Sequence, residues 1–403
     1  MIELEVGPVA HGGHCVARHE GRVVFVRHTL PGERVRAVLT DAGESARFWR
    51  ADAVEVLEAS PDRVPSAWPA AGPGGVGGGE LAHVSLDGQH RWKAAVVREQ
   101  LERLARLERD VVVESAPGDD ERAGLGWRTR IELVADASGR AGMHRHRSHD
   151  VVPLEDMPLA VPELRDAGLF TRHWAPGARL TAVAPVGGDR PLVLVDGVPL
   201  HRGAADTRPN ARTSVREVLE LDDGTRYVWR VAGAGFWQVH REAPRVLVEA
   251  VRAAVGPRPG ATVLDLYAGA GLLSAPLADA VGEAGRVVAV EGDPGAVRDA
   301  RRNLHARPQV DLRLGAVADV LDGVGAADVV VLDPPRVGAG QRVVERVAAT
   351  GAGRVVYVAC DPAALARDVA HFEELGYGLR ELRAFDLFPM THHVECVAVL
   401  DRG

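Results

Sequence analysis

From about residue 239 to the C-terminus, short runs rich in valine and leucine alternate with segments of helical periodicity. The runs lie at residues 262–266, 286–290, 310–314, 328–332 and 354–359, with helical segments such as 295–305 and 341–349 between them. Uniformly apolar strands that alternate with helices are typical of a parallel sheet covered on both faces. The alternation therefore predicts an α/β domain over residues 236–403.

A last pair of strand-like runs, at residues 379–385 and 394–400, follows this alternation. Because only a short loop separates them, we expect a hairpin that is added to the parallel sheet. Its first strand would run toward the carboxyl ends of the parallel strands, and its second strand would start from that edge. Open sheets of this kind bind ligands at the carboxyl edge, so the tip of the hairpin is a candidate position for functional residues.

Short strand patterns broken by glycine fill the N-terminal segment. Residues 23–26 are a run of apolar and aromatic residues, and residues 34–39 alternate between apolar and polar. Between them, residues 30–33 place proline and glycine where a turn needs them. Several strands in so short a segment predict a small β-barrel over residues 1–58.

The segment from residue 59 to residue 235 begins as a glycine-rich linker and then changes character. Apolar residues recur at spacings of three and four over residues 91–108, which predicts a helix. Strand patterns follow at residues 131–134, 192–195 and 227–231. We therefore expect a mostly β central domain that includes the linker and the helix.

Six arginines with interleaved histidines lie close together in this central segment. They are Arg122, Arg128, Arg130, Arg140, Arg145 and Arg147. A run of charge is often a solvated face. In a chain with a formal net charge of −8, however, such a concentration of arginine favours a surface that faces phosphate groups.

Composition excludes several classes of protein. Hydrophobic residues make up 46% of the 403 residues, as in globular rather than disordered chains. No apolar run approaches the roughly 18 residues of a membrane span, and the N-terminus lacks the pattern of a signal peptide, so a cytoplasmic location is expected. The three cysteines, Cys15, Cys360 and Cys396, are far apart. Neither a disulfide framework nor a thiolate metal site is predicted.

A glycine-containing turn, DLYAGAG at residues 265–271, ends the first of the parallel strands. Gly269 and Gly271 would let the backbone approach a ligand at the start of the following helix. Glu291 ends the next strand, where a carboxylate can accept hydrogen bonds from ribose hydroxyls. The turn lacks the third glycine of the dinucleotide fingerprint. This favours S-adenosylmethionine, which has no pyrophosphate, and leaves an NAD site as the alternative.

Three reactive side chains are expected at the same edge of the sheet. Asp333 follows the fourth strand, Cys360 follows the fifth, and Glu395 starts the last strand of the hairpin. Asp361 is a good N-cap residue and Pro362 suits the first position of a helix. A thiol just before a helix start is partly activated by the helix dipole. Cys396, inside a strand, is expected to be a packing residue.

Several motifs occur here in the order found in RNA uracil-5-methyltransferases. They are Phe236-Trp237-Gln238, residues 265–271, the DPPR stretch at 333–336, residues 358–368 and residues 386–395. In addition, residues 13–35 resemble a TRAM domain, an OB-like barrel. The resemblance covers nearly the whole chain. It implies a class I, Rossmann-like methyltransferase domain at residues 236–403 and an RNA-binding barrel at residues 1–58.

The resemblance also implies roles for individual residues. Cys360 would be the nucleophile and Glu395 the base that removes the C5 proton. The cofactor would lie among Gln238, Tyr267, Gly269, Gly271, Glu291 and Asp333. Because C5 of uracil is a poor nucleophile, a thiolate must first add to C6, and no metal is needed for this chemistry. Whether His393 orients the base or only caps the turn stays open.

Two departures from the family pattern stand out. The family usually has asparagine after the cysteine, whereas this chain has Asp361, whose charge would raise the pKa of the thiol. Many relatives also hold an iron–sulfur cluster on four cysteines. Alignment places those cysteines at Trp68, Val76, Gly79 and Met157. Since none of the four is cysteine here, no iron–sulfur cluster is expected.

The expected partner is structured RNA, with no membrane and no obligate protein partner implied. The layout favours 23S ribosomal RNA as the substrate, and a uridine in the T-loop of transfer RNA is the close alternative. A catalytically impaired RNA-binding protein is the alternative of another class. The intact pair of Cys360 and Glu395 argues against that alternative.

Overall fold

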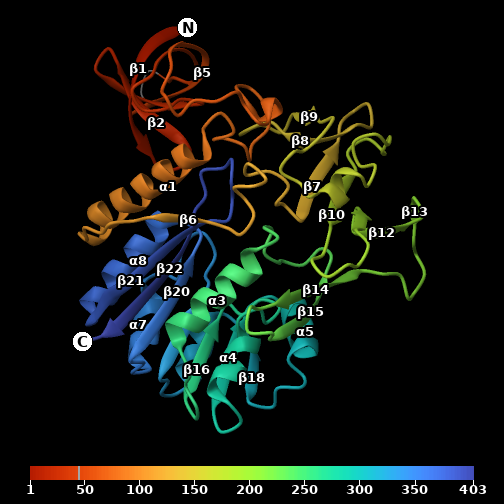
Figure 1. Cartoon of the computed structure of the whole chain (residues 1–403), viewed down its shortest axis with the longest axis vertical. Coiled ribbons are helices and arrows are strands. Elements are labelled where there is room, and N and C mark those ends of the chain that lie inside the picture. The colour runs from red at the N-terminus through yellow and green to blue at the C-terminus, as the bar shows by residue number, and fades with distance from the viewer. Residues whose placement is uncertain (44–45) are drawn as a thin grey trace.

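The computed structural model describes residues 1–43 and 46–403. The chain forms an N-terminal barrel, a central antiparallel sheet and a large C-terminal α/β sheet. Figure 1 shows the barrel and the central sheet above the C-terminal sheet, with helix α1 crossing between the barrel and that sheet. These three parts correspond to the fold predicted from the strand and helix patterns, and the domain boundaries of the sequence analysis stay a prediction.

The N-terminal barrel is closed by five short strands in the order β1-β2-β3-β5-β4. The strands are β1 Ile2–Ala10, β2 His14–His19, β3 Arg22–Arg27, β4 Arg34–Asp41 and β5 Trp49–Glu58. Alternate residues such as Leu4, Val24 and Val35 point into a buried core. The predicted barrel is therefore confirmed, and closure leaves none of these strands as a free sheet edge.

Helix α1, Leu86–Gln100, connects the barrel to the C-terminal sheet. It begins where the side chain of Ser85 accepts a hydrogen bond from the backbone N–H of Gly88. Trp92 and Val96 pack into the barrel core, while Val97, on an adjoining face, packs into the core of the C-terminal sheet. One helix thus buries apolar side chains in two domains at once.

The helix expected at residues 91–108 has different ends in the structure. It starts five residues earlier because Ser85 caps it, and after Gln100 it widens into a single π turn, η2, Leu101–Ala105. The backbone of Arg106 is left-handed, with φ of 57°, and ends the element. Leu104, expected on the apolar face, is exposed.

The central domain is a seven-stranded antiparallel sheet in the order β13-β12-β11-β10-β7-β8-β9. Its strands are β7 Arg130–Ala135, β8 Ala141–His144, β9 Val151–Pro153, β10 Arg179–Val183, β11 Leu192–Val195, β12 Val198–His201 and β13 Ala204–Ala205. The short helices η1, Pro69–Ala71, and α2, Pro162–Arg165, lie in the connections. The mostly β character of this domain is confirmed.

The six arginines of the central segment do not form one surface. Arg130 is buried and pairs with the buried carboxylate of Glu217 at 3.3 Å. Arg128 is half-buried, and its Nε donates to the backbone oxygen of Arg130. The expectation of six phosphate-facing arginines is therefore wrong for Arg130, because its buried guanidinium is held by a partner inside the protein. The outer arginines, Arg140, Arg145 and Arg147, are exposed.

Apolar packing occupies the positions aligned with cluster cysteines. Trp68, Val76 and Met157 are each 2% exposed and belong to one hydrophobic core cluster. At Gly79, an added Cβ would lie 2.6 Å from the Cβ of Ala71 and 2.9 Å from the ring of Trp68. The space between these segments is therefore filled by packed side chains.

The C-terminal sheet has eight strands in the order β18-β17-β16-β19-β20-β22-β21-β6. Its strands are β6 Val113–Ser115, β16 Thr262–Leu266, β17 Arg286–Glu291, β18 Val310–Leu314, β19 Val329–Leu332, β20 Arg354–Ala359, β21 Tyr377–Asp386 and β22 Glu395–Arg402. Strands β16 to β20 are parallel to one another, and β22 alone runs antiparallel to its neighbours β20 and β21. The predicted parallel sheet with an added hairpin is confirmed.

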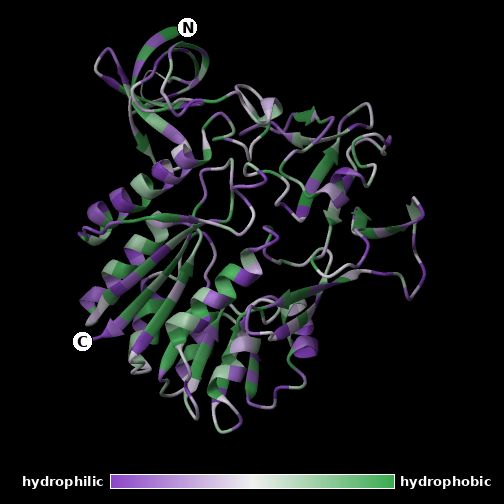
Figure 2. Cartoon of the chain, viewed as in Figure 1, coloured by the Kyte–Doolittle hydropathy of each residue, from purple (hydrophilic) through white to green (hydrophobic). Residues whose placement is uncertain are grey.

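Helices cover both faces of this sheet. One face carries α3 Ala243–Val255, α4 Ser274–Val281 and α5 Pro294–Asn303, together with the hairpin of β14 Ser214–Glu220 and β15 Arg226–Ala232. The other face carries α1, α6 Val317–Val320, η3 Leu321–Gly323, α7 Gln341–Ala349 and α8 Pro362–Glu374. Figure 2 shows strongly hydrophobic strands between helices whose outer surfaces are hydrophilic. In the described part of the chain, no helix combines the length and apolar character needed to cross a membrane.

A buried ion pair anchors the loop between β21 and β22. Lys93 of α1, the only lysine of the chain, is 0% exposed. Its Nζ lies 2.5 Å from Oδ1 of Asp386 and 3.1 Å from the backbone oxygen of Phe388. Burial lowers the pKa of Lys93. Burial alone would raise the pKa of Asp386, but the charge of Lys93 lowers it below its ordinary value.

We predict that Lys93→Met lowers the free energy of unfolding by about 3–5 kcal/mol, because it leaves the Asp386 carboxylate buried without its partner. Urea denaturation followed by circular dichroism measures the change. The control is Arg91→Met, on the same helix as Lys93, which removes an exposed partner of Asp62. We expect it to lower the free energy of unfolding by less than about 1 kcal/mol. Equal costs for the two variants would contradict the assignment of Lys93 as an anchor.

We also predict that protein purified without oxygen has no visible absorption band of an iron–sulfur cluster and less than one iron per chain. The physical reason is that Trp68, Val76 and Met157 fill the space with apolar atoms and supply no thiolate ligand. Spectroscopy and metal analysis of the anaerobic sample measure both quantities. A cluster band with stoichiometric iron would contradict the prediction.

Candidate active site

The carboxyl edge of the C-terminal sheet collects most of the site residues predicted from the sequence. Tyr267 follows β16, Glu291 ends β17, and Asp333 follows β19. Cys360 follows β20, and Glu395 begins the reversed strand β22. The strand order reverses between β16 and β19 at this edge, and such a reversal is the usual place of a ligand crevice in an open α/β sheet. We refer to this region as the crevice.

The turn after β16 has a backbone that suits a ligand. Tyr267 has φ of 65°, which is uncommon for an aromatic residue, and Gly269 and Gly271 also have positive φ, at 54° and 89°. A Cβ added at Gly269 would meet no atom within 4 Å, so the space above this glycine is open. The backbone N–H of Gly269 donates to Oε2 of Glu291 at 2.8 Å, which places that carboxylate directly beside the turn.

Gln238 lies in the segment between β15 and α3 and is half-buried. Its neighbour Trp237 packs against Trp229, with ring centroids 5.4 Å apart. The indole N–H of Trp229 donates to the backbone oxygen of Gly271 at 3.0 Å. This chain of contacts fixes the Gln238 segment beside the glycine turn.

Two carboxyl groups lie close together at the base of the crevice. Asp265 is 1% exposed, and its carboxylate accepts a hydrogen bond from the hydroxyl of Ser274 at the start of α4. Burial raises the pKa of Asp265 to about 7. Burial, together with the charge of Asp265, also raises the pKa of Asp333 to about 7. Crowded carboxyls of this kind favour a positively charged ligand.

Cys360 and Glu395 lie across from each other at the ends of neighbouring strands. In the antiparallel pairing of β20 with β22, Ala359 is opposite Cys396. The next position of this register brings Cys360 opposite Glu395 at the edge of the sheet. Glu395 is 4% exposed, whereas Cys360 is half-buried. The structure thus brings together the two residues predicted to do the chemistry.

The start of helix α8 follows Cys360 as the sequence predicted. Asp361 is the N-cap, and its Oδ1 accepts a hydrogen bond from the backbone N–H of Ala364 at 2.8 Å. Pro362 is the first residue of the helix. The thiol therefore lies at the positive end of the helix dipole.

The surroundings nevertheless disfavour the thiolate in the ligand-free protein. Burial raises the pKa of Cys360 to about 12, and the charges of Glu395, Asp333 and Asp361 add to the rise. Burial and the nearby Asp333 also raise the pKa of Glu395 well above its ordinary value. Both groups therefore bind their protons more tightly than free side chains do, and a positive charge in the site would oppose this effect.

Arg336 and His393 border this pair. Arg336 lowers the pKa of both Cys360 and Glu395. Arg336 belongs to the DPPR stretch, but its sequence pattern alone predicted no role for it. Burial lowers the pKa of His393 to about 3, and its ring contacts Phe388 and His392 at centroid distances of 5.7 and 4.1 Å. Because His393 is packed and neutral, it is better suited to supporting the loop than to transferring a proton.

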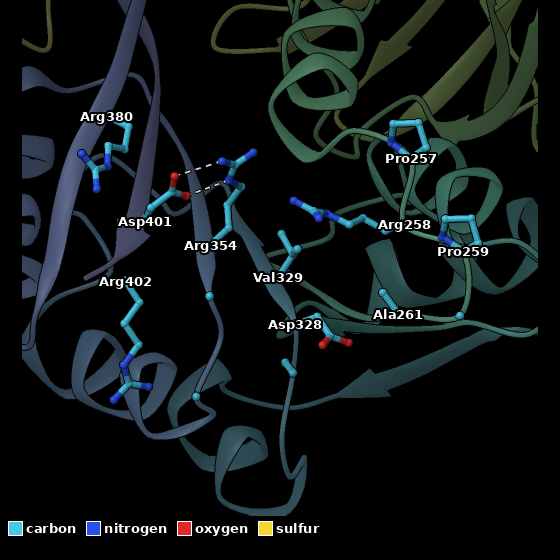
Figure 3. Close-up of a pocket in the computed structure, with 14 residues that line it drawn as sticks. Pro257, Arg258, Pro259, Ala261, Asp328, Val329, Arg354, Arg380, Asp401 and Arg402 are labelled. Atoms are coloured by element: carbon cyan, nitrogen blue, oxygen red, sulfur yellow. Dashed lines mark hydrogen bonds and ion pairs between the residues drawn. The ribbon is translucent and has the colours of Figure 1, made fainter.

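A hollow of about 910 Å³ lies at the opposite edge of the sheet. Figure 3 shows Arg354 paired there with Asp401, and Arg258, Arg380 and Arg402 around the rim. Arg354 binds Asp401 through two hydrogen bonds of 2.7 and 2.9 Å, which join β20 to β22. Because this hollow is at the amino ends of the parallel strands, it is separate from the residues of the crevice.

The fold and the crevice agree with comparisons to known proteins. Residues 209–403 match the model of the tRNA (uracil-5-)-methyltransferase family, and residues 1–54 match that of the TRAM domain. The chain belongs to the S-adenosylmethionine-dependent RNA uracil-5-methyltransferases that carry a TRAM domain. This membership confirms the predicted family and cofactor and excludes the NAD alternative.

Individual relatives match along the whole chain. An uncharacterized RNA methyltransferase of Streptomyces avermitilis is 46% identical, with 99% of this chain and 98% of the relative covered. One from Bifidobacterium longum is 44% identical, with 100% and 97% covered. The crystal structure of Pyrococcus abyssi tRNA (uracil-54, C5)-methyltransferase with S-adenosyl-L-homocysteine superposes with a TM-score of 0.71. The superposition covers 99% of this chain and 100% of the Pyrococcus abyssi chain, at 22% sequence identity. The likeness therefore shows a shared fold.

We predict that iodoacetamide alkylates Cys360 in the ligand-free protein more slowly than a free thiol. Its rate should rise by about tenfold per pH unit between roughly pH 7 and pH 9, since the thiolate fraction rises tenfold per unit below the pKa. Glu395→Gln should speed the reaction several-fold because it removes a nearby negative charge. Mass spectrometry of the labelled peptides measures both rates. Cys15 and Cys396, both 0% exposed, serve as internal controls that stay unlabelled, and a pH-independent rate would contradict the prediction.

Proposed function

We propose that this enzyme methylates C5 of a uridine in 23S ribosomal RNA through a covalent bond between Cys360 and C6 of the uracil. The observation that carries the proposal is the register of β20 and β22, which brings Cys360 opposite Glu395 beside the glycine turn. A nucleophile and a base on adjacent strands can act on C6 and C5, which are bonded neighbours of one ring.

In the proposed mechanism, Cys360 first gives up its proton to water, and its thiolate adds to C6. The C5–C6 double bond opens, and the electron pair moves to C5 as an enolate. When bound, S-adenosylmethionine supplies a methyl group on a positively charged sulfur. After C5 has taken this methyl group, Glu395 removes the C5 proton. The electron pair of the C–H bond re-forms the C5–C6 double bond as the sulfur of Cys360 leaves C6.

The protonation states follow from the charges of the crevice. In the free protein, a pKa of about 12 keeps the Cys360 thiol protonated at neutral pH, and the pKa of Glu395 is also raised. A positive charge close to the carboxyls lowers the pKa of acidic groups around it. Arg336 already acts in this direction. The enzyme thus has little free thiolate until the site is filled, which limits side reactions of the cysteine.

The residues of the glycine turn fit the cofactor predicted for them. Glu291 would hold ribose hydroxyls, since its carboxylate already accepts from the backbone of the turn. Gly269 and Gly271 would admit the cofactor close to the backbone. Tyr267 and Gln238 would border it, and the Asp333 carboxyl would face its positive end. The chemistry of this donor set, acidic and without a cluster of basic residues, suits a cation.

Two surfaces would bind the RNA. The TRAM barrel is one, and the exposed cations around β8, including Arg140, Arg145 and Arg147, are the other. Phe236, which is 73% exposed in the segment before Gln238, is available for base stacking. The barrel joined to a separate central domain supports a large folded RNA as substrate.

A uridine in the T-loop of transfer RNA is the second candidate substrate. Two observations favour it, namely the name of the matching family model and the whole-chain likeness to an enzyme named for uracil-54 of tRNA. Both candidate RNAs would present a uracil turned out of a folded loop.

A methylation assay tests the function and separates the substrates. We predict that labelled S-adenosylmethionine transfers its methyl group to RNA from a strain that lacks the gene, and that 5-methyluridine maps to 23S rRNA. Methylation confined to tRNA would move the proposal to the T-loop uridine. Binding of RNA without any methyl transfer would instead support the catalytically impaired RNA-binding protein.

Two variants test the covalent mechanism. Cys360→Ala should lower the rate by at least about 10³-fold, because C5 is no longer activated. Glu395→Gln should accumulate a complex of protein and methylated RNA that survives denaturing electrophoresis, because the C5 proton cannot leave. Glu381→Gln, on the exposed side of β21, is the matched control and should retain full turnover. Full activity of Cys360→Ala would overturn the mechanism.

A further inference from the structure

The turn between β1 and β2 of the barrel reaches the edge of the catalytic sheet. It consists of His11, Gly12 and Gly13. At one end of the turn, His11 contacts Asp361, the residue after Cys360. At the other end, Gly13 lies so close to His392, three residues before Glu395, that an added Cβ would crowd the histidine side chain. A three-residue segment of the N-terminal domain therefore touches both loops that carry the reactive groups.

The contact to the cysteine loop is a direct hydrogen bond. Nε2 of His11 lies 3.0 Å from Oδ2 of Asp361. The other oxygen of the same carboxylate, Oδ1, caps helix α8 through Ala364. The side chains of His11 and Asp361 are 36% and 22% exposed, so the bond is partly shielded from water. Asp361 is thus held from two sides, by its own helix and by the barrel.

The contact to the other loop requires glycine. Gly13 has φ of 80°, and an added Cβ would lie 3.1–3.2 Å from atoms of the His392 side chain. His392 in turn lies 3.4 Å from Oε2 of Glu80, which fixes its ring against the turn. The turn is therefore packed closely between the two loops and does not merely pass near them.

We propose that His11 is a positioning residue for Cys360, which holds the Asp361 carboxylate in place and cancels its charge beside the thiol. The proposal builds on the proposed function, in which Cys360 must form a thiolate. It gives the barrel a second role, as a part of the catalytic centre in addition to a surface for RNA.

The electrostatics agree with this geometry. The charge of Asp361 is one of the causes that raise the pKa of Cys360. The hydrogen bond to Asp361 raises the pKa of His11, although burial opposes the rise. The other charged groups that face His11 are Arg367 on α8, which lowers its pKa, and Glu99 on α1, which raises it.

The sign of the pH dependence follows from these shifts. Below its raised pKa, His11 is positive and compensates Asp361. As the pH rises through that pKa, the compensation is lost and Asp361 acts on the thiol alone. The ordinary pKa of histidine is about 6.5, and that of His11 is raised above it. The contribution of His11 is therefore greatest near pH 6.5 and small near pH 9.

The test uses the full-length enzyme and two readouts. In His11→Asn, we expect alkylation of Cys360 by iodoacetamide to slow by roughly three- to tenfold near pH 6.5, which is up to about one pKa unit, with convergence to the wild-type rate near pH 9. We expect kcat to show the same pattern, with an unchanged dissociation constant for S-adenosylmethionine.

The double variant His11→Asn/Asp361→Asn separates the charge from a merely structural role. Asparagine caps a helix as well as aspartate does but carries no charge, so both rates should return to within about twofold of wild type. His371→Asn, near the C-terminal end of α8, is the matched control and should leave both rates unchanged.

The outcomes are distinguishable. Alkylation that is unaffected by His11→Asn, or a double variant as slow as the single one, would overturn the positioning role. If the alkylation rates follow the expected pattern while even the wild-type enzyme methylates no RNA, the link between His11 and Cys360 stands and the proposed function fails.

Discussion

The antiparallel pairing of β22 with β20 is the constraint on which the candidate site depends. Five parallel strands deliver their carboxyl ends to one edge of the sheet. A sixth parallel strand in the position of β22 would present its end there, whereas the reversed strand presents its beginning. Glu395, the first residue of β22, thereby comes opposite Cys360, which follows β20. A shift of one residue in this register would turn the carboxylate to the other face of the sheet.

Several contacts hold that register from outside the sheet. The ion pair of Lys93 with Asp386 fixes the start of the loop that leads to Glu395, and the side-chain oxygen of Gln89 accepts a hydrogen bond from the backbone N–H of Met390 in the same loop. Both anchors lie on α1, which also packs into the barrel core. The N-terminal domain is thus connected to the loops beside Cys360 and Glu395 through a buried helix and through the turn that carries His11.

The acidic groups of the crevice affect one another's pKa values. Carboxyl groups crowd around a thiol, and their mutual repulsion together with burial raises the pKa of each. Such a site stores unfavourable energy that a cationic ligand relieves. S-adenosylmethionine carries a positive sulfur, so under the proposed function the same groups that hold back the thiolate in the free enzyme would also favour binding of the methyl donor.

Much of the fold was present in the sequence as local pattern. The alternation of apolar strands with helices determined the parallel sheet, and Asp361-Pro362 determined the start of α8, because hydrophobic periodicity and helix capping act over a few neighbouring residues. Motif order determined the family. Contacts between distant segments could not be predicted in this way. The pairing of Arg130 with Glu217, the burial of Lys93 and the bond from His11 to Asp361 join residues 87, 293 and 350 positions apart. Only the tertiary structure decided them, because side chains so far apart in the chain meet only when whole domains pack.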